Sequence, residues 1–474
     1  MIKEHTNTND MTNGNPVKLI LAFAIPLFVG NIFQQIYNVA DTMIAGYNLG
    51  DAAIAAIGAT SSIFSLLMNF ASGLNSGYGI VVARAFGAKN QDKLKKSIAA
   101  MIVLDLVITL MLTVFSLLFL NSLMRLLNIP DSIFADAYSY IAIITAGMLA
   151  TIVYNMLAGI MRAVGNSRTP LYFLILSCVI NLSLDCLFII GFGWGVEGAA
   201  AATVIAESLS ALFSGIYMFR KYREILPGRK HFHLDIPLIK EMAATGFAMA
   251  LMLCVVDVGS VIYQRAINGL GEMLIVSHTA ARKIIGIMMM PLASIATAYS
   301  TFTSQNWGAG KTERIRQTLK KVMAMEVGWG LFSCLAVFLL GGTAVRILTG
   351  TSDNNVIDNA VLSLRFHFVC YPALGILLAL RTSLQAIGRK AVPVISSSFE
   401  LIVKLIAGIW LIPKLGYLCV CLTEPVIWVS CAVFLIAEFM IQKPFDSNKE
   451  KAAAMGTVNT KDILDDCIVG KVVQ

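Results

Sequence analysis

Long apolar runs separated by short polar stretches follow one another along the whole chain. A transmembrane helix needs about 20 predominantly apolar residues, and runs of roughly that length or longer recur throughout the sequence. The pattern predicts an all-α polytopic membrane protein with twelve transmembrane helices, at residues 17–45, 53–83, 97–120, 135–161, 171–192, 197–219, 239–266, 274–304, 318–340, 360–386, 391–412 and 418–441.

Composition points to the same class of protein. Hydrophobic residues fill 57% of the 474 positions and charged residues 14%, whereas an ordinary soluble protein has ~45–50% apolar and ~25% charged residues. This balance excludes a soluble enzyme, a disordered scaffold and a secreted disulfide-rich protein. The nine cysteines include Cys419 and Cys421, whose spacing matches no metal or redox motif. We interpret the cysteines as small buried hydrophobic residues.

The basic residues predict the topology. The net charge of +8 comes from Lys and Arg in short blocks between apolar runs, so we interpret it as a topology signal and expect no nucleic-acid binding. The loops on one side of the predicted membrane hold most of these residues, including Arg84, Lys89, Lys93, Arg162, Arg168, Arg220, Arg229, Lys311, Arg314, Arg389 and Lys390. The positive-inside rule places both termini in the cytoplasm of a plasma-membrane protein. Residues 1–16 lack the pattern of a signal peptide, so we expect the first helix to direct insertion.

The second half of the chain repeats the first. Gly87-Ala88 aligns with Gly308-Ala309, and Ala163-Val164-Gly165 aligns with Ala386-Ile387-Gly388 at nearly the same offset along the chain. Each repeat holds six predicted helices, and an even number makes the repeats parallel about an axis along the membrane normal. We predict two lobes around a central cavity, which is the architecture of a transporter. The expected domains are a cytoplasmic N-terminal tail (1–16), an N-lobe (17–219), a cytoplasmic linker (220–238), a C-lobe (239–442) and a cytoplasmic C-terminal tail (443–474).

Two aspartates, an asparagine and a threonine form the strongest candidate site. An ionisable residue inside a membrane costs ~2.5–3.5 kcal/mol on insertion scales and marks a functional site by default. Asp41 in the first helix and Asp185 in the fifth both fall in the outer part of the predicted membrane. Asn181 lies one helical turn from Asp185 on the same face, and Thr203 falls at a similar depth on the sixth helix. We predict that these four residues form an ion-coupling site.

Two ions fit this site. Burial disfavours the charged form of a carboxylate, and two close carboxylates resist double ionisation, so we favour H⁺ as the coupling ion. Oxygen ligands at Asp41 and Asp185 could instead hold Na⁺. Beyond the coupling ion, we expect no cofactor and no bound metal. A purely structural role, in which each aspartate is satisfied by a helix neighbour, fits two acids at matched depth poorly.

Further polar residues within the apolar runs are candidates for other roles. Gln34, Tyr37 and Asn155 are candidate substrate contacts, and Asp257 in the seventh helix is a candidate ligand for a cation or substrate. Glu400 and Lys404 carry opposite charges one helical turn apart, which predicts a structural ion pair. The acids without an obvious partner are expected to border an aqueous cavity, and the arginines to snorkel or pair with an acid: Asp105, Glu207, Arg282 and Arg381.

The sequence lacks the usual signatures of an energy-coupled or hydrolytic enzyme. It holds no GxxxxGK[ST], HExxH or GxSxG motif, so we expect neither ATP-driven transport by this chain alone nor an intramembrane enzyme. A receptor or channel is disfavoured by the repeat and by the buried acid pair. We expect small cationic or amphipathic substrates, contact with membrane lipid, and a monomer.

Several segments together resemble the multidrug and toxic compound extrusion (MATE) family over about residues 15–442. They are Tyr37 to Thr42, Ala83 to Ala88, Asn181 to Asp185, Gly195 to Ala200 and Gln305 to Gly310. The resemblance implies antiport, in which a toxic compound leaves the cell as H⁺ or Na⁺ enters. It also implies two six-helix lobes that alternate between outward-facing and inward-facing states.

The resemblance also implies roles for particular residues. In one branch of the family, two aspartates, an asparagine and a threonine carry the ion, and those positions match Asp41, Asp185, Asn181 and Thr203. In another branch the acids lie on helices seven and ten; Asp257 matches the first, but the predicted tenth helix has no acid. The alternative function is a flippase for lipid-linked sugars, from the same superfamily. Such proteins line their cavity with cations, whereas the candidates here are mostly acidic.

Overall fold

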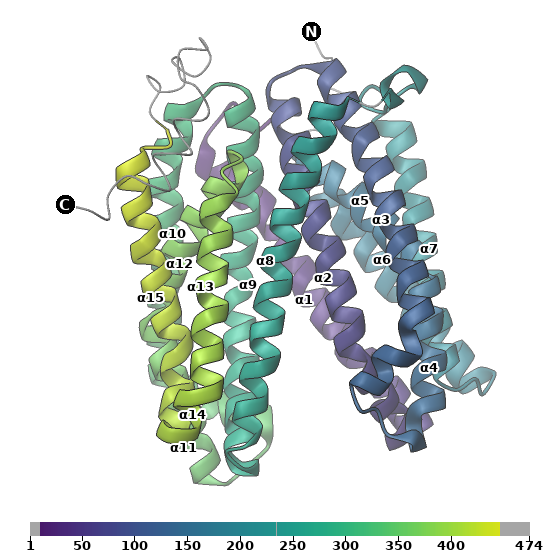
Figure 1. Ribbon diagram of the computed structural model, residues 1–474, viewed down its shortest axis with the longest axis vertical. Helices are drawn as coiled ribbons and strands as arrows, with labels where there is room; N and C mark the ends of the chain where they lie inside the picture. Colours follow the sequence, from purple (N-terminus) through teal and green to yellow (C-terminus); the bar gives the residue numbers. More distant parts are fainter. Residues whose placement is uncertain (1–9, 234, 446–474) are drawn as a thin grey trace.

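The computed structural model describes residues 10–233 and 235–445, and the described chain is almost entirely helical (Figure 1). The first lobe contains α1 (Pro16–Leu49), α2 (Asp51–Gly87), α3 (Gln91–Leu126), α4 (Asp131–Ala146), α5 (Met148–Ala163), α6 (Arg168–Asp185), η1 (Cys186–Gly191) and α7 (Val196–Lys221). A short η2 (Arg229–Phe232) follows. The second lobe contains α8 (Ile236–Asn268), α9 (Glu272–Gly308), α10 (Thr312–Thr349), α11 (Asn354–Val369), α12 (Tyr371–Ala386), α13 (Ala391–Ile406), η3 (Ala407–Leu411), α14 (Ile412–Leu415) and α15 (Tyr417–Gln442).

The predicted number of membrane spans is confirmed. Ten helical segments of the described chain are long and apolar enough to cross a membrane, and two bent pairs bring the number to twelve. The predicted fourth and tenth helices are these pairs: α4 and α5 meet at 44°, and α11 and α12 at 48°. Pro372 lies at the start of α12, where the missing N–H of proline is tolerated. The helices also extend beyond the apolar runs, because polar first and last turns reach past the hydrocarbon.

The two lobes repeat each other in backbone detail as well as in sequence. Gly50 and Gly271, which the repeat aligns, precede α2 and α9 with φ of 81° and 98°. The aligned glycines Gly165 and Gly388 both have φ of 88°, a conformation that residues with a Cβ atom disfavour. A π-helix follows both α6 and α13. The predicted pair of parallel six-helix repeats is therefore present, and Figure 1 shows the lobes side by side.

The start of α1 and the end of α15 lie at the same end of the molecule (Figure 1). We call this end, where the predicted topology has both termini, the inner face, and the opposite end the outer face. Toward the outer face the ribbons of the two lobes diverge. Two boundaries differ slightly from the expected domains: α7 continues to Lys221, and α8 begins at Ile236. Residues 446–474 of the expected C-terminal tail lie outside the described residues.

Residues 10–15 of the expected N-terminal tail are packed against the inner face. Met11 is 1% exposed and Thr12 is 3% exposed. The Met11 N–H donates to the Gln305 side chain at 2.9 Å, and Asn306 donates back to the Met11 carbonyl at 3.1 Å. The sequence missed this contact because a short polar segment without periodicity carries no signal of where it docks.

Candidate functional site

The four predicted coupling residues come together in the N-lobe. The carboxyl groups of Asp41, on α1, and Asp185, at the end of α6, face each other within hydrogen-bonding reach. Asp185 is fully buried. Within the described chain, neither carboxyl forms an ion pair with a Lys, Arg or His. A hydrogen bond between two carboxyl groups requires a proton on one of them, so the arrangement is suited to holding a proton.

Asn181 joins the acids to Thr203. Its side-chain amide is fully hydrogen-bonded in the orientation in which the nitrogen donates to Asp185 Oδ2 at 2.7 Å and to the Tyr37 hydroxyl at 3.0 Å. The amide oxygen then accepts from the Thr203 hydroxyl at 3.2 Å. The backbone beside this group is also unusual, because the α-helix α6 widens into the π-helix η1 directly after Asp185. Such π-helical segments are rare and occur frequently at functional sites.

A cavity of about 480 Å³ opens beside these residues, within the size range of sites for drug-sized ligands. Among the described residues, its lining comes from the N-lobe. Asp41 and Thr203 form part of its wall, together with the predicted substrate contacts Gln34, Tyr37 and Asn155. The structure thus places these three candidates in one cavity with Asp41 and Thr203, where each can contact a bound molecule.

Two further residues of this site were not singled out by sequence reasoning. Tyr140, on α4, lines the cavity and is close enough to Asp41 and Asp185 to feel their charges. Tyr154, on α5, lines the cavity and donates to the Pro170 carbonyl at 3.1 Å. A tyrosine in an apolar run has no pattern that distinguishes a cavity wall from the packed core, so the sequence could not have identified them.

Asp257 lies elsewhere. It accepts a hydrogen bond from Asn69 at 2.7 Å, which connects α8 of the C-lobe to α2 of the N-lobe. Asn69 lines the N-lobe cavity, whereas Asp257 is not part of the cavity wall. The structure therefore places Asp257 at the boundary between the lobes, next to a residue of the cavity wall, and its role as a ligand stays a prediction.

The C-lobe holds a chemically different counterpart of the coupling site. Lys404 is the fourteenth residue of α13, as Asn181 is of α6, and Glu424 is the eighth residue of α15, as Thr203 is of α7. Gly408 occupies the position that the repeat aligns with Asp185, so the C-lobe has no carboxylate there. A Cβ on Gly408 would lie 3.5 Å from the carbonyl oxygen of Ile262, the residue that aligns with Asp41.

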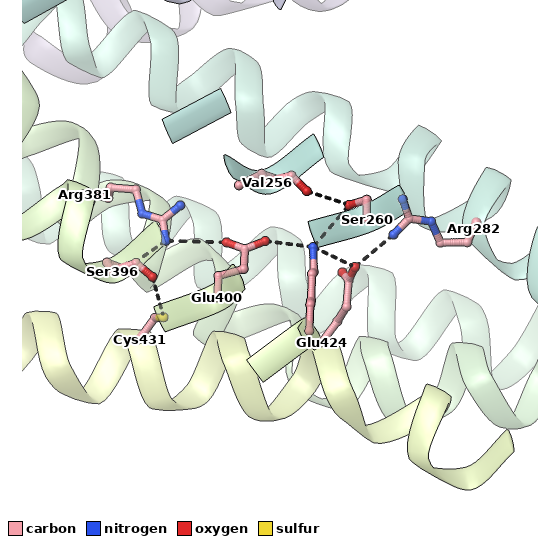
Figure 2. A network of polar contacts seen from close by, with 9 residues as sticks. Val256, Ser260, Arg282, Arg381, Ser396, Glu400, Glu424 and Cys431 are labelled. Atoms are coloured by element: carbon pink, nitrogen blue, oxygen red, sulfur yellow. Dashed lines mark hydrogen bonds and ion pairs between the residues drawn. The ribbon is translucent and has the colours of Figure 1, made fainter. Parts of the chain in front are cut away.

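This counterpart is filled by a chain of charged side chains (Figure 2). The Lys404 ammonium, 3% exposed, lies 3.0 Å from Glu400 Oε1 and 3.6 Å from Glu424 Oε1. Arg282 contacts Glu424 at 2.9 Å, and Arg381 contacts Glu400 at 3.9 Å. The predicted Glu400–Lys404 pair is confirmed, and both arginines pair with acids. A tethered ammonium therefore neutralises the C-lobe carboxylates, while the N-lobe carboxylates have no such cation.

Asp105 and Glu326 are acids at equivalent positions of the two repeats, on α3 and α10. Asp105 is 5% exposed and Glu326 is fully buried, and each has a carboxyl oxygen without a hydrogen-bond partner in the described chain. Neither lines the N-lobe cavity, so the expectation that Asp105 borders the aqueous cavity is wrong: α3 turns it into the protein. Glu207, by contrast, lines this cavity as expected.

The lobes close against each other at the inner face through contacts that the repeat duplicates. Arg84 Nε donates to the Ala386 carbonyl at 2.8 Å, and Nε2 of Gln305, which aligns with Arg84, donates to the Ala163 carbonyl at 2.8 Å. Glycines let the backbones meet here. A Cβ at Gly87 would lie 1.9 Å from the backbone carbonyl oxygen of Gln305, and one at Gly308 would lie 2.0 Å from that of Arg84. The inner face is closed, while the ribbons diverge toward the outer face.

Gly87→Ala is expected to open this inner contact, because the added methyl overlaps backbone atoms that cannot move aside. Gly58→Ala on the same helix is the control, since nothing lies within 4 Å of its Cβ position. The measurement is the rate at which a membrane-impermeant maleimide, added from the inner face, labels a Ser304→Cys variant. A rise of about tenfold or more, a shift of ~1.4 kcal/mol in the equilibrium, is expected with Gly87→Ala alone. Equal labelling rates in both variants would contradict the role of this contact.

Comparisons with known proteins agree with the fold. The MatE family model matches residues 26–187 and 248–410. Among similar proteins of Bacillus subtilis (strain 168), "Probable multidrug resistance protein YoeA" is 28% identical over 63% of this chain and 66% of its own length. "Probable multidrug resistance protein YpnP" is 24% identical over 80% of this chain and 84% of its own length. The crystal structure of "MATE in the bent conformation" superposes with a TM-score of 0.86 at 21% identity, covering 94% of this chain and 98% of that one. With both halves matched and the architecture shared, the chain belongs to the MatE family of multidrug efflux transporters.

Proposed function

We propose that this protein exports organic cations by antiport with protons across the plasma membrane, with both termini in the cytoplasm. One observation carries the proposal: Asp41 and Asp185 face each other beside a drug-sized cavity, and the described chain gives them no basic partner. The relatives named as probable multidrug resistance proteins support small-molecule export. The basic inner loops support the orientation.

The geometry supports a simple cycle. With the inner face closed, protons from the outer side reach the acid pair and favour release of a bound cation, because neutralising the pair removes its electrostatic attraction for a positive charge in the same cavity. The protonated pair then has no remaining attraction for a cation. When the inner contact of Gly87 and Gly308 separates, the pair releases its protons inward and can accept the next substrate. Transport requires that the ion and the substrate each bind with different affinity to the state with a closed inner face and to the state with an open one.

Sodium coupling and lipid-linked sugar transport are less well supported. Asp41, Asp185, Asn181 and Thr203 offer oxygen ligands of the kind that hard cations prefer, but a close carboxyl pair is most simply relieved by sharing a proton. A flippase would need several cations to hold a pyrophosphate. Arg162 is the only Lys or Arg among the described residues that line the N-lobe cavity, and two acids accompany it.

Gradient-driven uptake into inverted membrane vesicles tests the proposal. Uptake of an organic cation such as ethidium is expected when the vesicle interior is acidified in sodium-free buffer, since protons leaving the interior drive the cation in. Vesicles containing Asp185→Asn protein are the matched control and should show only background uptake. Uptake that appears solely with a sodium gradient, high inside, would overturn proton coupling and assign the same residues to Na⁺.

A further inference from the structure

We propose that Glu207 is the residue that anchors the cationic group of the substrate, separately from the coupling pair of Asp41 and Asp185. The inference rests on the proposed function and assigns its substrate class: amphipathic molecules with a positive charge. Glu207 lies on α7 one helical turn closer to the inner face than Thr203, and both residues line the N-lobe cavity. A molecule in this cavity can therefore contact the coupling site and Glu207 together.

Glu207 lacks a partner among the described residues. Its Oε2 atom is enclosed and receives no hydrogen bond from them, and the described chain provides no ion pair for its carboxyl. Tyr154 is close enough to feel its charge, but the Tyr154 hydroxyl already donates to Pro170. A half-buried carboxylate with one enclosed oxygen and no partner is costly. A cationic ligand would supply the missing charge and hydrogen bonds.

Arg162 determines which way such a ligand lies. It lines both the N-lobe cavity and a smaller cavity of about 200 Å³ between the lobes near the inner face. Within the described chain it forms no ion pair with Glu207. A positive group is repelled at Arg162 and attracted at Glu207. Tyr37 and Tyr140 line the cavity near the coupling acids, where their aromatic rings offer apolar surface to the uncharged part of the ligand.

The contrast with the C-lobe supports this assignment. There, the acids Glu400 and Glu424 are neutralised by Lys404 and two arginines. Trp428 occupies the position that the repeat aligns with Glu207, so the C-lobe has no acid at the equivalent position. Glu207 is thus an acid specific to the lobe that holds the cavity.

Equilibrium binding tests the anchor without any ion gradient. Purified Glu207→Gln protein is expected to bind tetraphenylphosphonium, a permanent cation, at least about tenfold more weakly than wild type, the effect of ~1.4 kcal/mol. Glu207→Asp should recover part of the affinity. Glu197→Gln, which removes an acid from the first turn of the same helix outside the cavity, should bind as wild type does.

A second measurement separates this inference from the proposed function. Vesicle uptake driven by an acid interior should show a raised KM for tetraphenylphosphonium in Glu207→Gln, with the maximal rate retained. If wild type binds and transports the cation while Glu207→Gln has unchanged affinity, the anchor is wrong and the antiport proposal stands. If Glu207→Gln loses the maximal rate with normal affinity, Glu207 belongs to the proton path and the anchor is again wrong. If wild type neither binds nor transports the cation, both proposals fail.

Discussion

Asp185→Asn is expected to abolish proton-driven efflux while the protein still folds and inserts. Asparagine preserves the volume and one hydrogen-bonding oxygen, so the Asn181 amide, 2.7 Å from Asp185 Oδ2, keeps an acceptor. The substituted amide cannot gain or lose a proton, so under the proposed mechanism Asp41 has no second carboxyl with which to share one. The measurement is drug resistance of cells that express the variant, with protein quantity checked in isolated membranes.

Asp41→Asn should fail in the same way, because the site works as a pair. Asp136→Asn is the matched control, since Asp136 is an exposed acid on α4 outside the cavity, and it should retain efflux. Near-normal resistance in either Asp41→Asn or Asp185→Asn, at normal expression, would show that the acid pair does not couple transport to the ion.

Lys404→Met is expected to be the most destabilising single change in the C-lobe network. It removes the ammonium that lies 3.0 Å from Glu400 and 3.6 Å from Glu424. Breaking a buried ion pair by removing one partner costs about 3–5 kcal/mol. Glu400→Gln should be milder, because Lys404 keeps Glu424. Thermal unfolding of the purified protein in detergent, followed by size-exclusion chromatography, measures both effects.

The double variant Glu400→Gln, Lys404→Met should unfold at a higher temperature than Lys404→Met alone. In Lys404→Met the Glu400 carboxylate loses its ammonium partner, and the second substitution removes that carboxylate. Glu424 keeps Arg282, which contacts it at 2.9 Å. Lys414→Met is the control, because Lys414 is exposed on α14 and should change stability little. Strictly additive losses in the double variant would indicate that the two side chains act independently.

Much of the architecture is determined by local sequence. Twelve spans, two repeats and the group of Asp41, Asn181, Asp185 and Thr203 could all be predicted, for two physical reasons. In a membrane every backbone polar group must be satisfied within the helix, so apolar length alone identifies the elements. An ionisable residue in an apolar run is also rare enough to be conspicuous, and helix direction then gives its depth.

What the sequence could not determine was which side chains meet across helices. Glu400 and Lys404 were predictable because one helix holds both, whereas their contacts with Arg381 and Glu424 depend on how α12, α13 and α15 pack. The same limit explains why Asp105 was expected at the cavity and lies in packed protein, and why the hydrogen bond between Asp257 and Asn69 could not be foreseen. Position along a helix fixes a side chain's depth in the membrane, but only the rotation and packing of the helices decide what that side chain faces.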